Sequence, residues 1–363
     1  MRFRAASIAT IAFLAAVVVL FAVAAARGGG VGAAVFGGSV PRGVPSTSSC
    51  DAACAVFSEP EAGIAPFMAL VRGASSSLDL VMYELEDPAV FAALADAAHR
   101  GVAVRVILNR RFYSPRGASF VRGNPNEMAY AALMRADIPV RWAPLGFTYT
   151  HEKAMAVDGT RLLVMSFNLV PKYYPTGRDF GVIDEDPADV AAMEAVFDDD
   201  WHGAAGKSGA SAAPGDALVW SPGSRGALVG MIATASRTLE VYNEEMADEK
   251  VAAALAAAAR RGVMVRIVMT WAAEWVPAWR MLAAAGAQVR TYPAAANGRY
   301  IHAKMIVADG VRAFVGSENF SATSLEENRE LGVMLAVPRG IGVLRAAFEG
   351  DWNAAQPFTR RGG

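Results

Sequence analysis

Two short segments of the sequence each place a histidine two residues before a lysine, His151 before Lys153 and His302 before Lys304. Residues two apart on a strand point to the same face, so each segment would turn an imidazole and an ammonium group toward one pocket. Lysine supplies a positive charge for a phosphate, and histidine, with an unperturbed pKa of about 6.5, can act as a nucleophile or carry a proton. Two such segments facing each other predict displacement at phosphorus, with a nucleophile on one side and an acid on the other.

Each segment is followed by polar residues at matching distances. The histidine is followed 28 residues later by a carboxylate in both copies, from position 151 to 179 and from 302 to 330. Serine and asparagine side chains just past the next strand can add neutral hydrogen-bond donors for a phosphate. These donors are Ser166 and Asn168 in the first copy and Ser317 and Asn319 in the second.

The two segments belong to a longer unit that the sequence contains twice. Residues 100–108 recur as residues 261–269 at an offset of 161, and His151 recurs as His302 at an offset of 151. The ten-residue difference between the two offsets predicts a longer surface loop in the first copy, in the Pro-, Gly- and Arg-rich stretch 114–126. Short apolar runs alternate with Ala-rich helical stretches, which suits strands buried on both faces by helices.

The predicted fold is therefore α/β, with two similar three-layer α/β/α lobes related by pseudo-twofold symmetry. A low-complexity stretch rich in Gly, Ala and Ser separates the copies. Each copy has the size of a domain rather than of a solenoid repeat. The expected segments are a leader at 1–27, a flexible tether at 28–58, the first lobe at 59–203, a linker at 204–217, the second lobe at 218–356 and a tail at 357–363.

The N-terminal residues predict export. Arg2 and Arg4 precede an apolar run over residues 5–26, long enough either for a signal peptide or for an uncleaved membrane anchor. Both alternatives place the body on the outer side of the cytoplasmic membrane, secreted or anchored, by the positive-inside tendency. In an oxidising compartment, Cys50 and Cys54 are expected to form a local disulfide.

Composition narrows the class of protein. Of the 363 residues, 54% are hydrophobic and 19% charged, which predicts a large core and excludes a disordered chain. Two Cys and four His argue against a metal cluster, and His99 and His202 are interpreted as structural. The net charge is −1, and removing the +3 of residues 1–40 leaves −4 on the rest. With this net charge, the chain beyond residue 40 lacks the broad positive surface expected of a protein that coats duplex nucleic acid.

The two motifs resemble those of the phospholipase D superfamily. His151-x-Lys153 with Asp158, and His302-x-Lys304 with Asp309 and Gly-Ser-x-Asn, carry the resemblance, which covers residues 59–354. The first motif departs from the pattern because Met165 stands where the family usually has Gly. We expect this change to reshape the first lobe, and it leaves open a non-catalytic protein that only binds phosphate.

The resemblance implies a phosphodiesterase that needs no metal or other cofactor and acts through a covalent phosphohistidine. His151 would be the nucleophile and His302 the general acid that later activates water. The lysines and asparagines would hold the phosphate oxygens, with Ser166 and Ser317 in support. Asp179 and Glu330 would orient the imidazoles, and Asp158 and Asp309 would bond nearby backbone. Glu84 and Glu245, equivalent in the repeat, could line the cleft or cap a strand end.

Three activities fit this resemblance. The first expectation is hydrolysis of glycerophospholipid head groups at a membrane surface by a monomer, in keeping with the expected export and the acidic body. The second is a nuclease, in which arginines of the first-copy loop follow a nucleic-acid backbone. The third is a phosphatidyltransferase resembling cardiolipin synthases. The arginines in question are Arg110, Arg111, Arg116 and Arg122.

Overall fold

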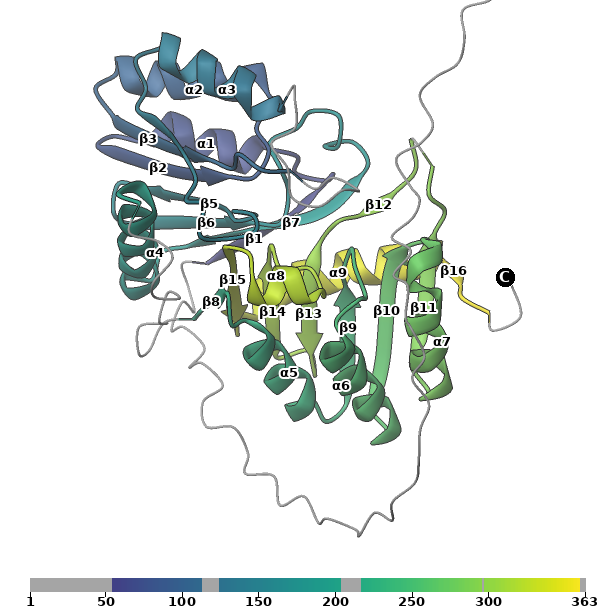
Figure 1. Cartoon of the computed structure of the whole chain (residues 1–363). Coiled ribbons are helices and arrows are strands. Elements are labelled where there is room, and N and C mark those ends of the chain that lie inside the picture. Colours follow the sequence, from purple (N-terminus) through teal and green to yellow (C-terminus); the bar gives the residue numbers. More distant parts are fainter. Residues whose placement is uncertain (1–53, 113–123, 204–216, 296, 360–363) are drawn as a thin grey trace, which may run out of the picture.

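The protein contains two β-sheets with the same strand order (Figure 1). The computed structural model describes residues 54–112, 124–203, 217–295 and 297–359. The first sheet runs β1-β7-β6-β5-β2-β3-β4, and the second runs β8-β15-β14-β13-β9-β10-β11 with β16 added beyond β11. The elements of the first lobe are β1 (Ala55–Glu59), α1 (Ala65–Gly73), β2 (Ser77–Met82), α2 (Pro88–His99), β3 (Ala103–Leu108), α3 (Pro125–Arg135), β4 (Val140–Trp142), β5 (Lys153–Val157), β6 (Arg161–Met165), β7 (Gly177–Asp184) and α4 (Pro187–Trp201).

The second lobe repeats this order of elements. Strands β12 and β16, the short 3-10 helix η1 and helix α8 have no named counterpart in the first lobe. Its elements are β8 (Leu218–Ser221), α5 (Arg225–Thr234), β9 (Thr238–Tyr242), α6 (Glu249–Arg260), β10 (Met264–Thr270), η1 (Ala273–Trp275), α7 (Val276–Ala284), β11 (Gln288–Tyr292), β12 (Tyr300–Ile301), β13 (Lys304–Ala308), β14 (Arg312–Gly316), α8 (Ala322–Glu326), β15 (Glu330–Leu335), α9 (Pro338–Ala354) and β16 (Gln356–Pro357).

Equivalent sequence signals begin and end equivalent helices. Asp87 caps α2 by accepting a hydrogen bond from the backbone of residue 89, and Asp248 caps α6 in the same way. Each helix is followed by an Arg-Gly pair whose glycine has a φ near +90°, 92° at Gly101 and 91° at Gly262. Because this conformation strains any residue with a Cβ, glycine ends both helices cleanly.

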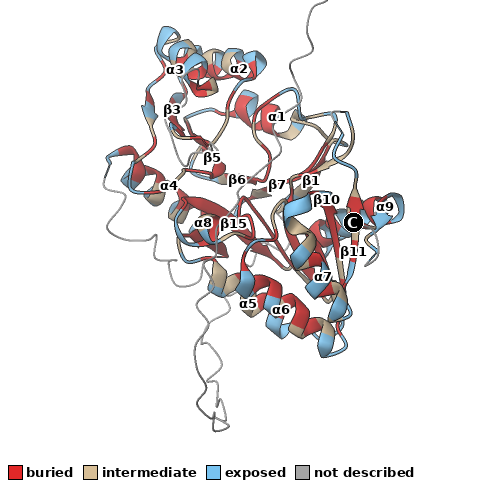
Figure 2. Ribbon diagram, turned by 45° about the vertical axis from the view of Figure 1, so that its right-hand side comes forward, coloured by how far each residue is buried: buried red, intermediate tan, exposed pale blue. Residues whose placement is uncertain are grey.

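The layers explain why most strand residues are apolar. Helices α1, α2 and α3 cover one face of the first sheet, and α5, α6 and α7 cover one face of the second (Figure 1). On the inner faces, β5, β6 and β7 pack against β14 and β15, with α4 and α9 beside them. Figure 2 shows the buried residues concentrated along this join and under the helices. The prediction of two similar α/β lobes is confirmed.

Two buried ion pairs cross between the lobes at equivalent positions. Arg178 of the first lobe pairs with Asp351 of the second at 2.6 Å, and Arg329 of the second pairs with Asp200 of the first at 3.0 Å. All four side chains are at most 5% exposed. Removing one partner of such a pair leaves an uncompensated buried charge. These two pairs therefore favour the observed arrangement of the lobes.

The lobes extend beyond the expected boundaries. Strand β1 pairs with β7 from residue 55, so part of the expected tether 28–58 belongs to the first sheet, because its short apolar run completes that sheet's edge. Pro357, expected in the tail, pairs with Arg290 of β11. Strand β12, from the second lobe, pairs with β7 of the first.

Several expected segments lie outside the described residues. These are the leader 1–27 and most of the expected loop and linker. Cys54 takes part in a disulfide, while Cys50, its expected partner, lies outside the described residues. Within the described ranges, no helix combines the length and apolarity needed to cross a bilayer.

Candidate active site

The backbone of each histidine forms a hydrogen bond to the opposite lobe. The backbone N–H of His151 donates to the carbonyl of Arg329 at 2.8 Å, directly before β5 begins. The backbone N–H of His302 donates to the carbonyl of Arg178 at 3.3 Å, directly before β13 begins. The arginines that join the lobes therefore also fix the backbone of both motifs.

The carboxylate that orients each imidazole comes from the other lobe. His151 Nδ1 lies 2.7 Å from Oε2 of Glu330, and His302 Nδ1 lies 2.9 Å from Oδ1 of Asp179. A carboxylate at Nδ1 favours the tautomer with its proton there, which leaves Nε2 for chemistry at phosphorus. Thus each histidine has the expected kind of partner, and the pairing is crossed between the lobes.

Both carboxylates are fixed by further hydrogen bonds. Oε1 of Glu330 accepts from Ser324 Oγ at 2.6 Å and from Asn328 Nδ2 at 2.9 Å. Asp179 accepts from Ser166 Oγ at 2.6 Å. Sequence reasoning missed Ser324 and Asn328, although both lie within six residues of Glu330. These donors leave each carboxylate little freedom to rotate away from its histidine.

The hydroxyls of the two serines form hydrogen bonds inside the protein. Ser166 and Ser317 are fully buried. The Ser166 hydroxyl serves Asp179, and the Ser317 hydroxyl lies between the backbone groups of Leu331, which donate and accept at 3.1 and 3.4 Å. Because their hydrogen bonds are used inside the protein, we assign them to positioning in place of direct phosphate contact.

Lys153, Lys304 and Asn319 lie among the groups around the two histidines. Lys153 and Lys304 are fully buried, and each donates to the carbonyl of its own histidine. The amide of Asn319 donates to the carboxylates of Glu244 and Glu245 at 3.2 and 3.1 Å. Oδ1 of Asn168 is buried and has no hydrogen-bond partner among the described residues.

Burial and neighbouring charges shift the pKa values of the groups around His151. Burial lowers the pKa of His151 to about 4, although the charge of Glu330 acts in the opposite direction. Burial also lowers the pKa of Lys153 to about 7, and the charge of Lys304 adds to this effect. Burial would raise the pKa of Glu330, but the adjacent His151 outweighs it and the pKa is lowered. At neutral pH, His151 is an uncharged imidazole beside a carboxylate.

Two aspartates of the motifs lie outside the site. Asp158 and Asp309 both have a φ of +56° at the turn that ends their strand. Asp158 accepts hydrogen bonds from the backbone of residues 75–77, and Asp309 does the same for residues 236–238. They tie the turn after β5 or β13 to the start of β2 or β9.

Met165 changes the core behind the first motif. It is fully buried in β6 opposite Gly181, whose missing Cβ leaves room for the ring of Phe57. In the second lobe, the matching positions are Gly316 and Gly332. A Cβ on Gly316 would lie 2.2 Å from the Glu318 carboxylate. Each lobe is thus packed differently, and in the first lobe Ser166 still reaches Asp179.

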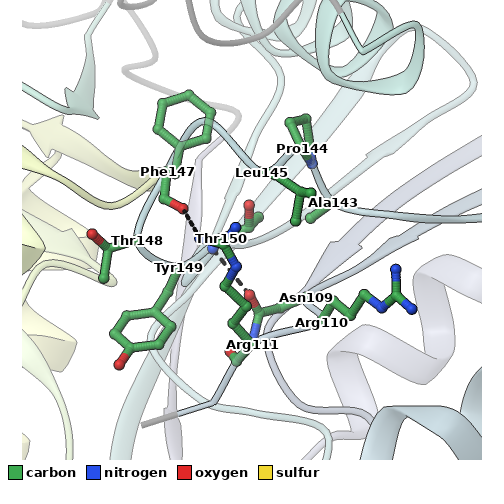
Figure 3. Close-up of a pocket in the computed structure, with 10 residues that line it drawn as sticks. All are labelled: Asn109, Arg110, Arg111, Ala143, Pro144, Leu145, Phe147, Thr148, Tyr149 and Thr150. Carbon is green, nitrogen blue, oxygen red and sulfur yellow. Dashed lines mark hydrogen bonds between the residues drawn. The ribbon is translucent and has the colours of Figure 1, made fainter. Parts of the chain in front are cut away.

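A small hollow lies beside the segment that leads to His151. It is lined by Asn109, Arg110, Arg111 and residues of the stretch 143–150 (Figure 3). Arg111 donates to the carbonyl of Phe147 at 3.3 Å, and Asn109 accepts from the backbone of Thr150 at 3.1 Å. Two of the four arginines considered for nucleic-acid contact therefore lie near this segment, and Arg116 and Arg122 lie outside the described residues.

The pKa values predict a pH profile limited on both sides. Protonation of His151 removes the nucleophile, so kcat/KM should fall as the pH decreases through about 4. Deprotonation of Lys153 removes a positive charge, so kcat/KM should also fall as the pH rises through about 7. The measurement is kcat/KM for bis(p-nitrophenyl) phosphate, whose own charge is constant over this range. A profile that rises steadily through neutral pH would contradict the assignment of Lys153.

The chain matches known proteins over both lobes. A family model described as "Cardiolipin synthase, PLD-like domain" matches residues 67–201 and 228–352. Phospholipase D Z of Dictyostelium discoideum is 36% identical over 107 residues, which make up 28% of this chain and 25% of that protein. The chain therefore spans about a quarter of the length of this relative.

Two solved structures have a similar fold. Phosphatidylserine synthase of Haemophilus influenzae Rd KW20 has a TM-score of 0.63 at 10% identity, over 86% of this chain and 88% of that one. Polyphosphate kinase of Porphyromonas gingivalis has a TM-score of 0.61 at 14% identity, over 82% of this chain and 50% of that one. With both lobes matched by the family model and both motifs in place, the chain belongs to the phospholipase D superfamily.

Proposed function

We propose that the protein is an exported phosphodiesterase that hydrolyses the head groups of glycerophospholipids. The observation that carries the chemical part is the pair of crossed contacts, His151 with Glu330 and His302 with Asp179. Both contacts use Nδ1 and orient Nε2 for catalysis. Lys153, Lys304 and Asn319 near them supply charge and hydrogen bonds for the phosphate oxygens, and Asn168 is the counterpart of Asn319 in the first copy.

The mechanism assigns the first step to the neutral imidazole. Nε2 of His151 attacks phosphorus, a P–N bond forms and the P–O bond to the alcohol breaks. His302 gives its proton to the departing oxygen. In the second step His302 takes a proton from water, the water oxygen attacks phosphorus and the P–N bond breaks. The products are the free alcohol and a phosphomonoester, and both histidines return to their starting states.

Support for a lipid substrate comes from charge and from the N-terminal sequence. The chain beyond residue 40 has a net charge of −4, which is unfavourable for a polyanionic polymer. The apolar run at residues 5–26, as a signal or an anchor, would bring the enzyme to a membrane. The matched relative is itself named a phospholipase D.

The test is a comparison of substrates with the purified full-length chain. Phospholipids in detergent micelles, single-stranded and duplex DNA, and bis(p-nitrophenyl) phosphate are incubated with the enzyme and with the His151→Ala variant. We expect release of free head group and phosphatidic acid, both absent with the variant. Degradation of DNA without release of any head group would overturn the lipid assignment and favour the nuclease.

A second candidate, phosphatidyl transfer, shares the first step. It is favoured by the family description of the matched domains. Adding phosphatidylglycerol as the acceptor separates the two outcomes, because a transferase forms cardiolipin at the expense of phosphatidic acid. Formation of phosphatidic acid alone supports hydrolysis.

A further inference from the structure

One carboxylate in the second lobe occupies the groups that the mechanism assigns to the phosphate. Oε2 of Glu244 lies 3.0 Å from Nζ of Lys304, 3.2 Å from Nδ2 of Asn319 and 3.6 Å from Nε2 of His302. Its other oxygen accepts a hydrogen bond from the hydroxyl of Tyr300. A single oxygen atom thus contacts a lysine, an asparagine and the reactive nitrogen of a histidine. A non-bridging phosphate oxygen would need the same position.

The first lobe has no carboxylate at the equivalent position. Tyr83 corresponds to Glu244 at the repeat offset of 161. Its ring centroid lies 4.5 Å from that of His151, and Nζ of Lys153 lies 5.0 Å from the ring centroid. The lysine of the first lobe therefore faces an aromatic ring, while the lysine of the second lobe faces an anion. The two halves of the site present different surroundings to a bound diester.

Glu244 remains ionised in this setting. Burial would raise its pKa, but the charges of Lys304 and His302 and the Tyr300 hydrogen bond outweigh burial, and the pKa lies well below the usual value. Burial and the charge of Glu244 raise the pKa of the adjacent Glu245 to about 7. Glu244 is accordingly an ionised carboxylate on the Nε2 side of His302, opposite the Asp179 carboxylate at Nδ1.

A phosphodiester must displace this carboxylate in order to bind Lys304 and Asn319. The side chain of Glu244 is 25% exposed, so it has solvent on one side into which it can turn. The backbone of Glu244 keeps its carboxylate close to Lys304 and Asn319 even after the side chain turns, so a phosphate bound to those two residues would be repelled by it. A cation carried by the substrate removes the repulsion. In ethanolamine and choline esters, the ammonium group is two carbons beyond the ester oxygen.

We propose that Glu244 is a specificity-determining residue that favours phosphodiesters whose alcohol carries an ammonium group over those whose alcohol is neutral. The assignment rests on the proposed function for its substrate class. The mechanism places the departing alcohol beside His302, where Tyr300 lies with its ring centroid 6.0 Å from that of the histidine and its hydroxyl bonded to Glu244. Carboxylates together with aromatic faces are groups that recognise alkylammonium ions.

The test measures binding in the absence of turnover. Calorimetry compares glycerophosphoethanolamine with glycerophosphoglycerol, both in the His151→Ala background. The ethanolamine diester is expected to bind more tightly, and adding Glu244→Gln should reduce this preference about tenfold, mainly through tighter binding of the glycerol diester. The matched control, Glu185→Gln, changes an exposed glutamate and should leave the preference unchanged. A preference unaltered by Glu244→Gln overturns the proposal.

Turnover of lipids separates this inference from the proposed function. Phosphatidylethanolamine and phosphatidylglycerol are compared in identical micelles with the wild type and with Glu244→Gln. If neither lipid is cleaved but the binding preference shifts, the lipid assignment fails and the role of Glu244 stands. If both lipids are cleaved with a head-group ratio that the substitution leaves unchanged, the role of Glu244 fails. Should Glu244→Gln lose its cooperative thermal transition, Glu244→Ser is measured in its place.

Discussion

His302→Ala is expected to convert the enzyme into one that stops after its first step and retains a phosphorylated His151. With a p-nitrophenyl ester the leaving group needs no proton, so Nε2 of His151 can still attack phosphorus and release nitrophenolate. The second step then lacks the base that activates water, and turnover should fall by about 10²–10⁴-fold. Stopped-flow absorbance should show a burst close to one nitrophenolate per enzyme, followed by a slow phase.

Locating the phosphoryl group on the protein decides which histidine is the nucleophile. Mass spectrometry of digested His302→Ala protein should place the group on the peptide that contains His151, and the linkage should be labile to acid as expected for a phosphoramidate. His151→Ala should give neither a burst nor a labelled peptide. A label on His302 in the wild type, or a burst that survives in His151→Ala, would reverse the assigned roles.

Most of the correct predictions from sequence, of both the fold and the site, came from the internal repeat. Its offsets predicted two similar lobes, and the 28-residue spacing identified both histidines and both orienting carboxylates. The crossing could not be predicted, because Asp179 follows His151 in the chain at the same spacing as Glu330 follows His302. Only packing of the lobes decides which carboxylate reaches which ring. Arg178 and Arg329, which directly precede these carboxylates, pair with the other lobe in the structure, a contact that the sequence does not show.

Differences between the copies were harder to interpret than their similarities. Tyr83 and Glu244 occupy equivalent positions, yet the first contacts its lysine through a ring face and the second through a carboxylate. A sequence motif records residue types, and it does not show whether a hydroxyl such as that of Ser166 faces the phosphate or a buried carboxylate. Those outcomes depend on side-chain hydrogen bonds formed after the two sheets have packed together.

Glu330→Gln and Asp179→Asn should slow different steps because of the crossed contacts. The amide can still accept from Ser324 and Asn328, but it removes the negative charge that stabilises His151 when a positive charge develops on its ring during attack. We expect Glu330→Gln to reduce the rate constant of the nitrophenolate burst by about 10²–10⁴-fold and to leave hydrolysis of the phosphohistidine less affected.

The companion variant gives the opposite pattern. Asp179→Asn withdraws the carboxylate from His302, so the burst with a nitrophenyl ester should stay fast and the slow phase should become slower still. Pre-steady-state absorbance separates the two rate constants, and thermal unfolding of each variant controls for stability. If Glu330→Gln slowed only the second step, Glu330 would act on the histidine of its own lobe. If the burst is slowed in Glu330→Gln and not in Asp179→Asn, each histidine depends on a carboxylate from the opposite lobe. Neither lobe is then a complete catalyst without the other.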